Sequence, residues 1–506
     1  MTGLIDIIAS GRRVEDHRPW PRAAVDAATW QVAAGRVAEG KGTLLGLWGD
    51  VGAVHMALLD EGVAEIAVLT LECPEGRFPS VGLRHPPALR LERAIRDLYG
   101  LAPIGAADSR PWLDHGRWDI RHPLGANSPE PATPTPYSFL PTEGEGLHRI
   151  PVGPVHAGII EPGHFRFTAN GETVVRLEER LGYVHKGIES LMAGAPIERA
   201  ARLASHVSGD SAVAYTLAFA RAVESALGIE APPRAVWLRA LMAELERLAN
   251  HFGDIGAICN DASFTLIHAH CGVLRERVLR AADACFGHRL MMGCIIPGGT
   301  AADPSREGVA IVGSLVAEVR RTFPKLVELY DSTASLQDRT VGTGILRPDL
   351  ARQFGCGGYV GRASGRAFDA RRALGYPPYP SLRFDVPVLT AGDVDARVWV
   401  RVREVEQSLA LIEQILAQLP DGTVLASIEG ARFSGTREGM ALAEGFRGDV
   451  LAWVRIAGDG AVARCHLRDP SWFQWPLLEA VIEGNIVADF PLCNKSFNCS
   501  YSGHDL

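Results

Sequence analysis

Long apolar runs are missing from this sequence. Its 506 residues contain no run of about 18 consecutive apolar residues, the length that a membrane-spanning helix needs. The N-terminal residues show no positively charged start followed by an apolar core, so no signal peptide is predicted. We therefore expect no transmembrane segment, and any association with a membrane would come through partner subunits.

Clusters of positive charge are missing as well. The formal net charge is −8, and lysine and arginine form no dense patch in the sequence. This argues against a nucleic-acid partner. Hydrophobic residues make up 47% of the chain and charged residues 22%, which is the composition of a globular protein with a large core. The length favours roughly two to four domains.

Closely paired cysteines are also absent. The nine cysteines are odd in number and irregularly spaced, and no two of them form a C-x-x-C pair. This favours free thiols in a reducing compartment over a disulfide framework. Cys493 and Cys499 lie nearest to each other, close to the C-terminus. Two thiolates can form half of a transition-metal site, but on spacing alone free thiols are the better interpretation.

A proline-rich stretch divides the chain. The five prolines between residues 126 and 147 exclude a helix or a central strand, so we predict an extended linker there. Before it, apolar stretches at 43–50, 54–60 and 65–73 predict short strands, and residues 88–100 predict a helix that ends at Gly100. Residues 1–125 should therefore form a small α/β sandwich-like domain.

The residues after the linker have mainly helical patterns. Asn170 and Gly171 predict a hairpin turn near the start of this part. Two apolar segments close to the C-terminus predict paired strands at 449–458 and 461–469. The fold class is therefore α+β, with a mainly helical domain over 148–506 and a small peripheral β region. Helices are predicted at 211–228, 233–260, 305–340 and 396–419.

Two segments carry histidines in places that suggest a site. "GPVHAGIIEPGHFRF" puts His156 and His164 on a glycine- and proline-rich loop, which could line a site or form a solvated turn. In "GYVHKGIESLMAG", His185 and Glu189 are four residues apart and would share one face of a helix. That pair could relay protons or could be an ordinary ion pair on a helix surface.

Arginines gather in the segment "VGRASGRAFDARRALGYPPYP" and just after it. The cluster could hold an anion or could pin two domains together. Its glycines fit neither a phosphate-binding loop nor a dinucleotide-binding turn, so nucleotide binding is not predicted. The charged residues are Arg362, Arg366, Asp369, Arg371, Arg372 and Arg383.

Several of these segments resemble the blocks of one family, in its order. They are "GPVHAGIIEPGHFRF", "GYVHKGIESLM", "ELERLANHFGDIG", "RTVGTGIL" and "GRASGRAFDARRALGYPPY". The family comprises the large subunits of membrane-bound nickel–iron hydrogenases of group 4, the formate hydrogenlyase and hydrogenase-4 type, and the related 49 kDa subunit of complex I. Residues 1–125, with "LERAIRDLYGL", resemble the 30 kDa subunit of complex I, which is fused to the large subunit in the formate hydrogenlyase type.

The metal ligands of this family are largely missing. Its hydrogenases hold nickel and iron with four thiolates, one pair after the "GIE" block and one pair at the C-terminus. Ser205 and Ser208 stand near the first pair; at the tail Cys493 matches one cysteine, Ser496 replaces the other, and Cys499 falls outside the pattern. Serine is a poor ligand for soft metals. The resemblance therefore implies a chain without a nickel–iron centre, with an atypical metal site at Cys493 and Cys499 as the alternative.

The resemblance also implies candidate catalytic residues. The complex I relatives bind quinone with a histidine on the loop that matches His156, and with a tyrosine whose position falls near Ser205 here. A quinone-like cavity would therefore involve His156 and Ser205. The glutamate of the "GIE" block, here Glu189, passes protons to the cavity in this family, and His185 would be its relay partner.

The setting follows from the same resemblance. We expect an oxidoreductase subunit of the NADH-quinone oxidoreductase or hydrogenase type, bound peripherally at the cytoplasmic face of the inner membrane. Its partners would be an iron–sulfur subunit of the complex I 20 kDa or hydrogenase small-subunit type and the ion-pumping subunits of a membrane arm. The iron–sulfur cluster would belong to the partner, and this chain would hold no cofactor firmly. The alternatives are an atypical nickel–iron hydrogenase and a structural coupling subunit without redox chemistry.

Overall fold

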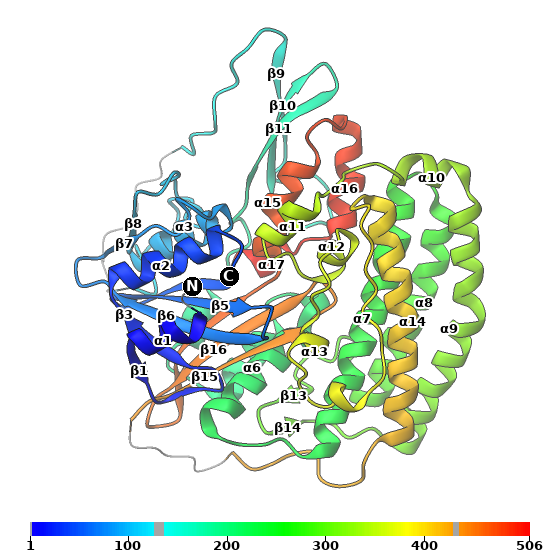
Figure 1. Cartoon of the computed structure of the whole chain (residues 1–506). Helices are drawn as coiled ribbons and strands as arrows, with labels where there is room; N and C mark the ends of the chain where they lie inside the picture. The colour runs from blue at the N-terminus through cyan, green and yellow to red at the C-terminus, as the bar shows by residue number, and fades with distance from the viewer. Residues whose placement is uncertain (1–2, 126–135, 429–434) are drawn as a thin grey trace.

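The computed structural model describes residues 3–125, 136–428 and 435–506. As predicted, the chain folds as an α+β protein: a sheet with flanking helices is followed by long helices and by a second sheet. Figure 1 shows the two sheets on one side of the molecule and the long helices on the other.

The first sheet is built from N-terminal residues. Its strand order is β1-β3-β6-β5-β4, in which β4, β5 and β6 form an antiparallel meander. The three predicted strands are confirmed as β4, β5 and β6, and the predicted helix as α3, which ends at Gly100 with a φ of 74°. The elements are α1 (Leu4–Ser10), β1 (Arg12–Val14), β3 (Arg22–Val25), α2 (Ala27–Ala38), β4 (Thr43–Asp50), β5 (Ala53–Asp60), β6 (Glu65–Glu72), β7 (Arg77–Pro79), α3 (Leu89–Tyr99) and β8 (Ala102–Ile104).

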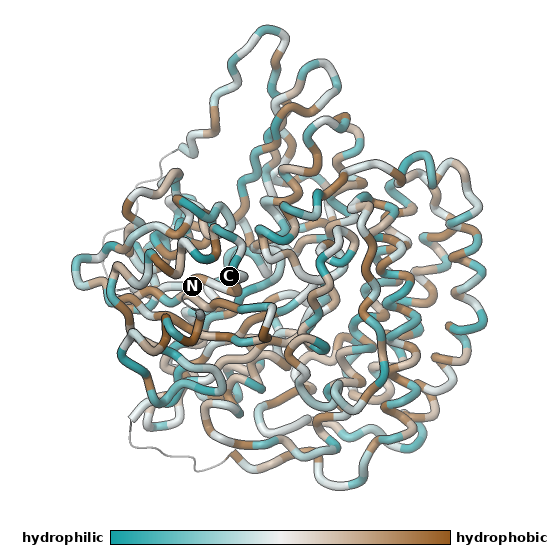
Figure 2. Tube along the Cα trace, in the orientation of Figure 1, coloured by the Kyte–Doolittle hydropathy of each residue, from teal (hydrophilic) through white to brown (hydrophobic). Residues whose placement is uncertain are grey.

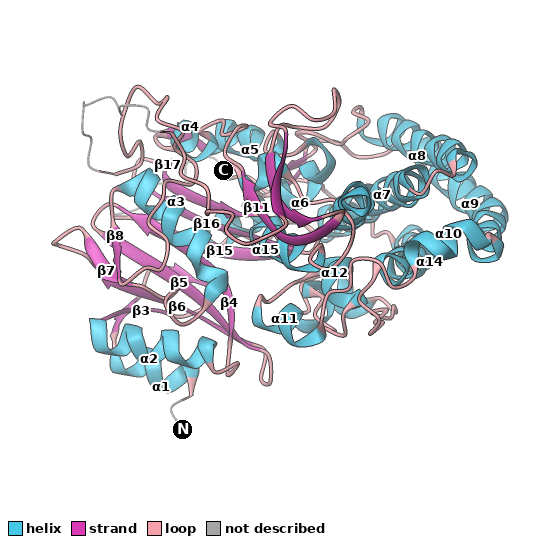
Figure 3. Ribbon diagram, turned by 90° about the horizontal axis from the view of Figure 1, so that it is seen from above, coloured by secondary structure: helices cyan, strands magenta, loops and turns pink. Residues whose placement is uncertain are grey.

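The two faces of this sheet are buried against different elements. Side chains alternate along a strand, so neighbouring residues of β5 point to opposite faces. Met56 and Leu58 belong to a core shared with α2, whereas Ala57 and Leu59 belong to a core shared with the second sheet. Figure 3 shows α1 and α2 on the outer side of this sheet.

The second sheet joins distant parts of the chain. Its order is β12-β17-β16-β15-β2, and β2, from the N-terminal residues, pairs in parallel with β15. The two strands predicted near the C-terminus are confirmed as β16 and β17. The strands are β2 (His17–Arg18), β12 (Ala195–Pro196), β15 (Arg437–Glu444), β16 (Asp449–Ile456) and β17 (Ala461–Arg468).

Long helices cover the other face of the second sheet and continue as a bundle. The helix α6 packs directly on β15 and β16, and α7 connects it to the rest of the bundle. In Figure 2, hydrophobic and hydrophilic residues alternate along these helices, as expected when each helix buries one side. Within the described residues, no helix combines the length and the apolarity needed to cross a bilayer. The main helices are α6 (Ala212–Leu227), α7 (Pro233–Asp261), α8 (Thr265–Phe286), α9 (Arg306–Ser332) and α14 (Val394–Gln418).

One predicted helix is divided in the structure. The helical pattern at 305–340 forms α9 and then α10 (Ala334–Thr340), separated by Thr333. Thr333 has an extended backbone, with φ −88° and ψ 100°, and it caps α10. A β-branched residue favours such a conformation over the helix interior, and the apolar period alone did not reveal the break.

A three-stranded sheet projects from the body of the molecule (Figure 1). The predicted hairpin at Asn170 and Gly171 is confirmed, and Gly171 adopts a φ of 59°. Residues 126–135 of the predicted linker lie outside the described residues, and residues 136–146 contain no helix or strand. The strands are β9 (Leu147–Val152), β10 (His164–Asn170) and β11 (Thr173–Arg180).

Short elements complete the large domain, and the last of them, at the C-terminus, is buried in the protein. Residues 499–506 are all buried. Figure 1 places this end of the chain beside the N-terminal sheet. The short elements are α4 (Ile188–Met192), α5 (Ile197–Ser205), β13 (Ile295–Ile296), β14 (Gly299–Thr300), α11 (Pro348–Gln353), α12 (Gly358–Ala363), α13 (Ala370–Ala373), α15 (Ser471–Val481), α16 (Phe490–Phe497) and α17 (Tyr501–His504).

Candidate functional site

His156 meets a tyrosine from the C-terminal helix. The Nε2 atom of His156 lies 3.3 Å from the hydroxyl oxygen of Tyr501, the first residue of α17. Burial lowers the pKa of His156, so the neutral ring can accept a hydrogen bond from the hydroxyl. The sequence prediction found His156 but missed Tyr501, because no spacing pattern links residues 345 positions apart.

Two glycines make room for this contact. A Cβ atom at Gly163 would lie 2.6 Å from the ring of Tyr501, and one at Gly153 would lie 2.2 Å from the carbonyl oxygen of Gly163. Gly153 also has a φ of 84°, which favours glycine. The glycines of the "GPVHAGIIEPGHF" loop therefore let the loop fold back on itself and approach Tyr501.

Next to the contact between His156 and Tyr501, a hydrogen bond between two serines connects the C-terminal segment with the residues that follow α5. The Ser500 hydroxyl donates to Ser208 Oγ at 3.1 Å, and Ser208 Oγ donates to Asp210 at 2.7 Å. Burial alone would raise the pKa of Asp210, but Arg447 outweighs it, and the pKa falls to about 2. Ser208, near the position of the first metal-binding pair, thus meets the C-terminal segment through Ser500, next to Tyr501.

Ser205 takes a different position. Its hydroxyl donates to the carbonyl oxygen of Arg202 at 2.7 Å and lies 3.0 Å from Nδ1 of His206. The side chain is fully buried at the end of α5. Its hydroxyl is thus used by its own helix, whereas Ser208 reaches the tail; a role of Ser205 in acceptor binding stays a prediction.

The two C-terminal cysteines lie in surroundings that do not suit a metal. Cys493 packs against Gly344, where an added Cβ would lie 2.6 Å from its sulfur, and Cys499 lies 4.0 Å from the amide oxygen of Gln474. Burial raises the pKa of Cys493 to about 12 and raises that of Cys499 as well. Burial therefore favours the thiol over the thiolate, the form that binds soft metals.

A nickel–iron centre does not fit these residues. Among residues 3–125, 136–428 and 435–506, no three His, Cys, Asp or Glu side chains converge as metal ligands. The hydroxyls of Ser205, Ser208 and Ser500 already take part in hydrogen bonds to protein groups. The donor set that remains is two cysteine sulfurs and engaged hydroxyls, too few soft ligands for a nickel–iron cluster.

Glu189 pairs with a histidine that the sequence did not suggest. Its carboxylate accepts hydrogen bonds from Nδ1 of His466 at 3.0 Å and from the backbone N–H of Leu467 at 2.9 Å. His185, the predicted partner, instead places Nδ1 3.0 Å from the carbonyl oxygen of Asp505. The predicted helical pairing of His185 with Glu189 is wrong.

The prediction failed because the helix that contains Glu189 begins after His185. The helix α4 starts at Ile188, after Gly187 with a φ of 64°, so His185 lies outside it. The ring of His185 packs on Trp118, at 4.8 Å between ring centroids, in the N-terminal part of the chain. Glu189 is buried, with 6% of its surface exposed. The carboxylate therefore lies inside the protein, and its imidazole partner comes from β17.

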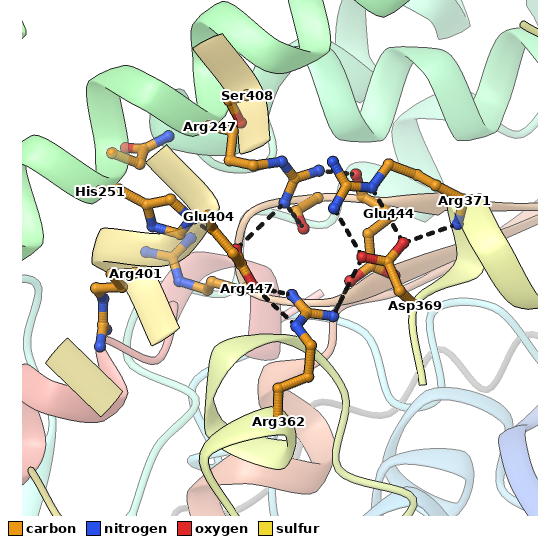
Figure 4. A network of polar contacts seen from close by, with 12 residues as sticks. Arg247, His251, Arg362, Asp369, Arg371, Arg401, Glu404, Ser408, Glu444 and Arg447 are labelled. Carbon is orange, nitrogen blue, oxygen red and sulfur yellow. Dashed lines mark hydrogen bonds and ion pairs between the residues drawn. The ribbon is translucent and has the colours of Figure 1, made fainter. Parts of the chain in front are cut away.

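A buried network of charges lies between α7, α14 and the second sheet (Figure 4). Arg362 donates to Glu404 at 2.7 Å and to Glu444 at 2.9 Å, and it lies 3.5 Å from Asp369. His251 also contacts Glu404, at 2.7 Å. Burial and the nearby Asp369 raise the pKa of Glu444 to about 7. These charges are paired, which is the condition for burying them.

The network continues through a second arginine. Arg371 binds both carboxylate oxygens of Asp369, at 3.0 and 2.7 Å, and donates to Glu244 at 2.9 Å. Glu244 also accepts from Ser408 at 2.7 Å and from Arg247 at 3.3 Å. Burial alone would raise the pKa of Glu244, but the two arginines lower it.

The arginine-rich segment therefore fits the second of its two predicted roles. Arg362 and Arg371 have carboxylate partners within the large domain, and Arg366 pairs with Glu61 of the N-terminal domain at 2.5 Å. Arg372 and Arg383 are exposed. Through Arg362, Arg366 and Arg371, whose charges carboxylates already neutralise, the segment holds elements and domains together rather than presenting these three arginines to an anion.

Comparisons with known proteins identify the family to which this chain is similar. Residues 262–438 match the family model of the respiratory-chain NADH dehydrogenase 49 kDa subunit. Formate hydrogenlyase subunit 5 of Escherichia coli (strain K12) is 33% identical over 85% of this chain and 77% of its own length. Hydrogenase-4 component G of the same organism is 33% identical over 90% of this chain and 80% of its own length.

Two further matches extend this picture. The carbon monoxide-induced hydrogenase of Rhodospirillum rubrum is 30% identical over 69% of this chain and 97% of its own length. A chain in the structure of the membrane-bound sulfane sulfur reductase, an archaeal respiratory membrane complex, superposes with a TM-score of 0.67 at 26% identity, covering 72% of this chain and 99% of that chain. The protein therefore belongs to the family of complex I 49 kDa subunits and group 4 hydrogenase large subunits, and it is an oxidoreductase subunit of a complex I-like or hydrogenase-like membrane complex.

Proposed function

We propose that this chain is a peripheral-arm subunit, on the cytoplasmic face of the inner membrane, that couples electron transfer to ion translocation without a nickel–iron centre. Its partners are an iron–sulfur subunit, which delivers the electrons, and the ion-pumping subunits of a membrane arm. The acceptor is a quinone-like molecule. The observation that supports this best is the contact between His156 and Tyr501 beside Ser208 and Ser500.

The chemistry of the pair suits a carbonyl acceptor. Reduction of a quinone to a hydroquinone consumes two electrons and two protons, and both oxygens become hydroxyls. A buried tyrosine hydroxyl can donate to one carbonyl oxygen, and a neutral imidazole can exchange a proton with it. Tyr501 would then replace the tyrosine that complex I relatives carry near the position of Ser205. Glu189 would supply protons for this reduction.

A second acceptor class is favoured by one observation. The structural match to the sulfane sulfur reductase covers nearly that whole chain, at a TM-score of 0.67. Sulfane sulfur is reduced by two electrons with cleavage of a sulfur–sulfur bond, which does not need a carbonyl-binding pair. Dependence of turnover on the Tyr501 hydroxyl therefore separates the two acceptors.

The test uses the purified complex with its partner subunits. Reduction of a short-chain quinone, reduction of polysulfide and evolution of hydrogen are measured in the wild type and in Tyr501→Phe. The matched control is Tyr330→Phe, which also loses a buried hydroxyl bond, to Asp395 at 2.8 Å, but far along the bundle in α9. We expect quinone reduction to fall about fivefold only in Tyr501→Phe, because one hydrogen bond contributes about 1 kcal/mol.

Other outcomes would support the alternatives. Stoichiometric nickel in elemental analysis, together with hydrogen evolution, would show an atypical hydrogenase and overturn the proposal. Polysulfide reduction that is indifferent to Tyr501→Phe would identify the second acceptor. Full assembly without reduction of any acceptor would identify a structural coupling subunit.

A further inference from the structure

A cavity of about 540 Å³ lies outside the candidate site, between α6, α7 and residues 376–381. Small-molecule sites in proteins have volumes of roughly 300–1,000 Å³. The third wall of this cavity belongs to the tyrosine- and proline-rich end of the arginine-rich segment, which the proposed function does not use. The cavity is therefore a candidate site for a second ligand.

The two helices each turn one face toward this cavity. Leu217, Arg221 and Ser225 line it from α6, and successive members of this set are four residues apart. Pro233 and Trp237 line it from α7 and are also four residues apart. Residues at this spacing share one face of a helix. The walls from the helices are therefore mainly apolar, with Arg221 among them.

Two tyrosines fix the third wall. The hydroxyl of Tyr379 donates to Glu244 at 2.8 Å, and the hydroxyl oxygen of Tyr376 accepts from the backbone N–H of Glu444 at 3.1 Å. The two tyrosine rings meet edge to face, with 5.2 Å between centroids and 85° between planes. Because both hydroxyls bind groups inside the protein, the rings are left as the surface of the cavity.

Arg221 brings a positive charge to these apolar walls. Its guanidinium packs on the ring of Tyr376, with 4.1 Å from Cζ to the ring centroid, and it donates to the carbonyl oxygen of Leu442. Within the described part of the chain, no carboxylate lies within ion-pair distance of Arg221. Burial lowers the pKa of Arg221, but an arginine stays protonated in proteins. This charge therefore lacks the carboxylate partners that Arg362 and Arg371 have.

The other charged groups of the cavity do not neutralise Arg221. Glu224 binds Arg239 with both carboxylate oxygens, at 3.0 and 2.5 Å, and accepts from the backbone N–H of Gly298 at 2.7 Å. Glu230, the other carboxylate in the lining, is exposed. The cavity thus combines one half-buried cation without an ion pair and one exposed carboxylate.

We propose that this cavity binds a small organic monoanion, a carboxylate with an apolar or aromatic body. The carboxylate accepts hydrogen bonds from Nε and Nη2 of Arg221, and the body packs against Trp237 and Tyr376. Hydrogen bonds between ions are stronger than those between neutral groups, and aromatic side chains bind flat apolar groups. Glu230 disfavours a ligand with a second negative charge, since like charges repel.

The test measures the binding of two matched probes to the purified complex with its partner subunits. The first probe, 2-naphthoate, carries a carboxylate on an aromatic body, and the second, 2-naphthamide, has the same body without the charge. Isothermal titration calorimetry gives the affinity of each probe. We expect 2-naphthoate to bind at least about tenfold more tightly, the factor that a hydrogen bond to a charged group supports.

Replacing Arg221 identifies the group that binds the anion. Arg221→Met keeps an apolar side chain against the ring of Tyr376 but removes the charge, so the preference for 2-naphthoate should disappear while 2-naphthamide binds as before. The matched control is Arg166→Met, which also loses a cation–π contact, to Phe139 at 3.7 Å, but lies in β10. Both probes should bind this control as they bind the wild type.

Two exposed residues of the lining test the site without changing the core. Glu230→Gln removes a negative charge and should strengthen the binding of 2-naphthoate, whereas Ser381→Glu adds one and should weaken it. Each change should be roughly twofold to fivefold, the range for charges near a protein surface. Neither variant should alter the affinity for 2-naphthamide.

The outcomes decide this proposal independently of the acceptor site. Equal affinities of the two probes would overturn it, and so would a complex that binds neither probe because a partner subunit already fills the cavity. A preference for 2-naphthoate that persists in both Arg221→Met and Ser381→Glu would place the anion elsewhere and overturn it as well. Tyr501→Phe should bind both probes as the wild type does, so a failure of the proposed function leaves this result unchanged.

Discussion

At the scale of single residues, this protein places many charges in its interior and pairs nearly all of them. Arg362, Arg397 and Arg401 have no exposed surface, and each has hydrogen-bond acceptors around it. The free-energy cost of desolvating an ion is offset only when such partners are present. The stability of the bundle should therefore be far more sensitive to these arginines than to arginines on the surface.

Replacing Arg362 with methionine tests this sensitivity. The variant leaves Glu404 and Glu444 buried without their cation, so we expect a loss of about 3–5 kcal/mol in the free energy of unfolding. Arg347→Met is the control, because that side chain is 72% exposed and its ion pair with Asp349, itself 68% exposed, lies on the surface. Its effect should stay within about 0.5 kcal/mol. Denaturant unfolding measures both, and equal midpoints would contradict the argument.

The sequence identified the arginine-rich segment but not its partners. Glu404 and Glu444 are 42 and 82 residues away from Arg362, and no local pattern connects them. The same limit applies to Glu189, whose partner His466 is 277 residues away. Local spacing can propose that a residue has a role, but the partner depends on which strands and helices pack together.

A histidine at the domain interface should make stability depend on pH. His17 is buried, its Nδ1 lies 2.7 Å from the carbonyl oxygen of Trp20, and burial lowers its pKa to about 4. The unfolded chain, with a pKa of about 6.5, binds this proton first as the pH falls. The contribution is therefore complete above about pH 6.5, is lost progressively down to about pH 4, and reaches about 3 kcal/mol.

His17→Asn keeps a donor for the carbonyl oxygen of Trp20 but removes the titration. We expect the fall in unfolding free energy between pH 7 and pH 5 to be about 2 kcal/mol smaller in the variant, since each pH unit is equivalent to about 1.4 kcal/mol. Other buried histidines keep their own contributions in both proteins. Unfolding curves at the two pH values give the difference, and parallel losses in wild type and variant would count against it.

At the scale of elements, the second sheet depends on a very close approach of α6. A Cβ atom at Gly439, in β15, would lie 1.9 Å from the carbonyl oxygen of Ala222 and 2.7 Å from the backbone nitrogen of Ala226. Glycine is therefore required by packing at this position, where no positive φ demands it. Any larger residue must push the helix away from the strand.

Gly439→Ala should consequently destabilise the protein. We expect a loss of about 1–3 kcal/mol, the usual cost of overpacking a well-packed core. Gly313→Ala is the matched change in α9, where nothing lies within 4 Å of the added Cβ. There the lower flexibility of alanine should stabilise the helix by about 0.5–1 kcal/mol. Thermal unfolding gives both signs, and two changes of the same sign would refute the packing argument.

Elements themselves were largely predictable, because their signals are local. The strands β4, β5 and β6, the helices α6, α7 and α14, and the turn at Gly171 all follow from apolar period and turn residues. The late start of α4 after Gly187 was missed, and this moved His185 away from Glu189. The contact of Tyr501 with His156 was missed as well, because it depends on how the C-terminal residues return to the loop.

At the scale of the whole molecule, the two sheets share one continuous hydrophobic core. The inward face of the first sheet belongs to the same apolar core as α6 and the second sheet. The strand β2 leaves the N-terminal residues and pairs with β15, and Arg366 pairs with Glu61 across the same boundary. The linker therefore divides the sequence into two parts as predicted from its prolines, but residues from both parts pack into the same core.

This sharing predicts the behaviour of the N-terminal part when it is expressed alone. A fragment of residues 1–125 would expose six apolar side chains that are at most 3% exposed in the whole protein: Leu45, Trp48, Ala57, Leu59, Ile66 and Val68. Each large apolar side chain loses about 1.5–3 kcal/mol when it is exposed, and an apolar sheet face of this kind promotes association. We therefore expect the fragment to aggregate, and to become soluble when residues 136–506 are co-expressed as a second chain.

Size-exclusion chromatography of the fragment alone and of the co-expressed pair measures this difference in solubility. A monodisperse, folded fragment that does not bind the second chain would mean that the two sheets are independent domains.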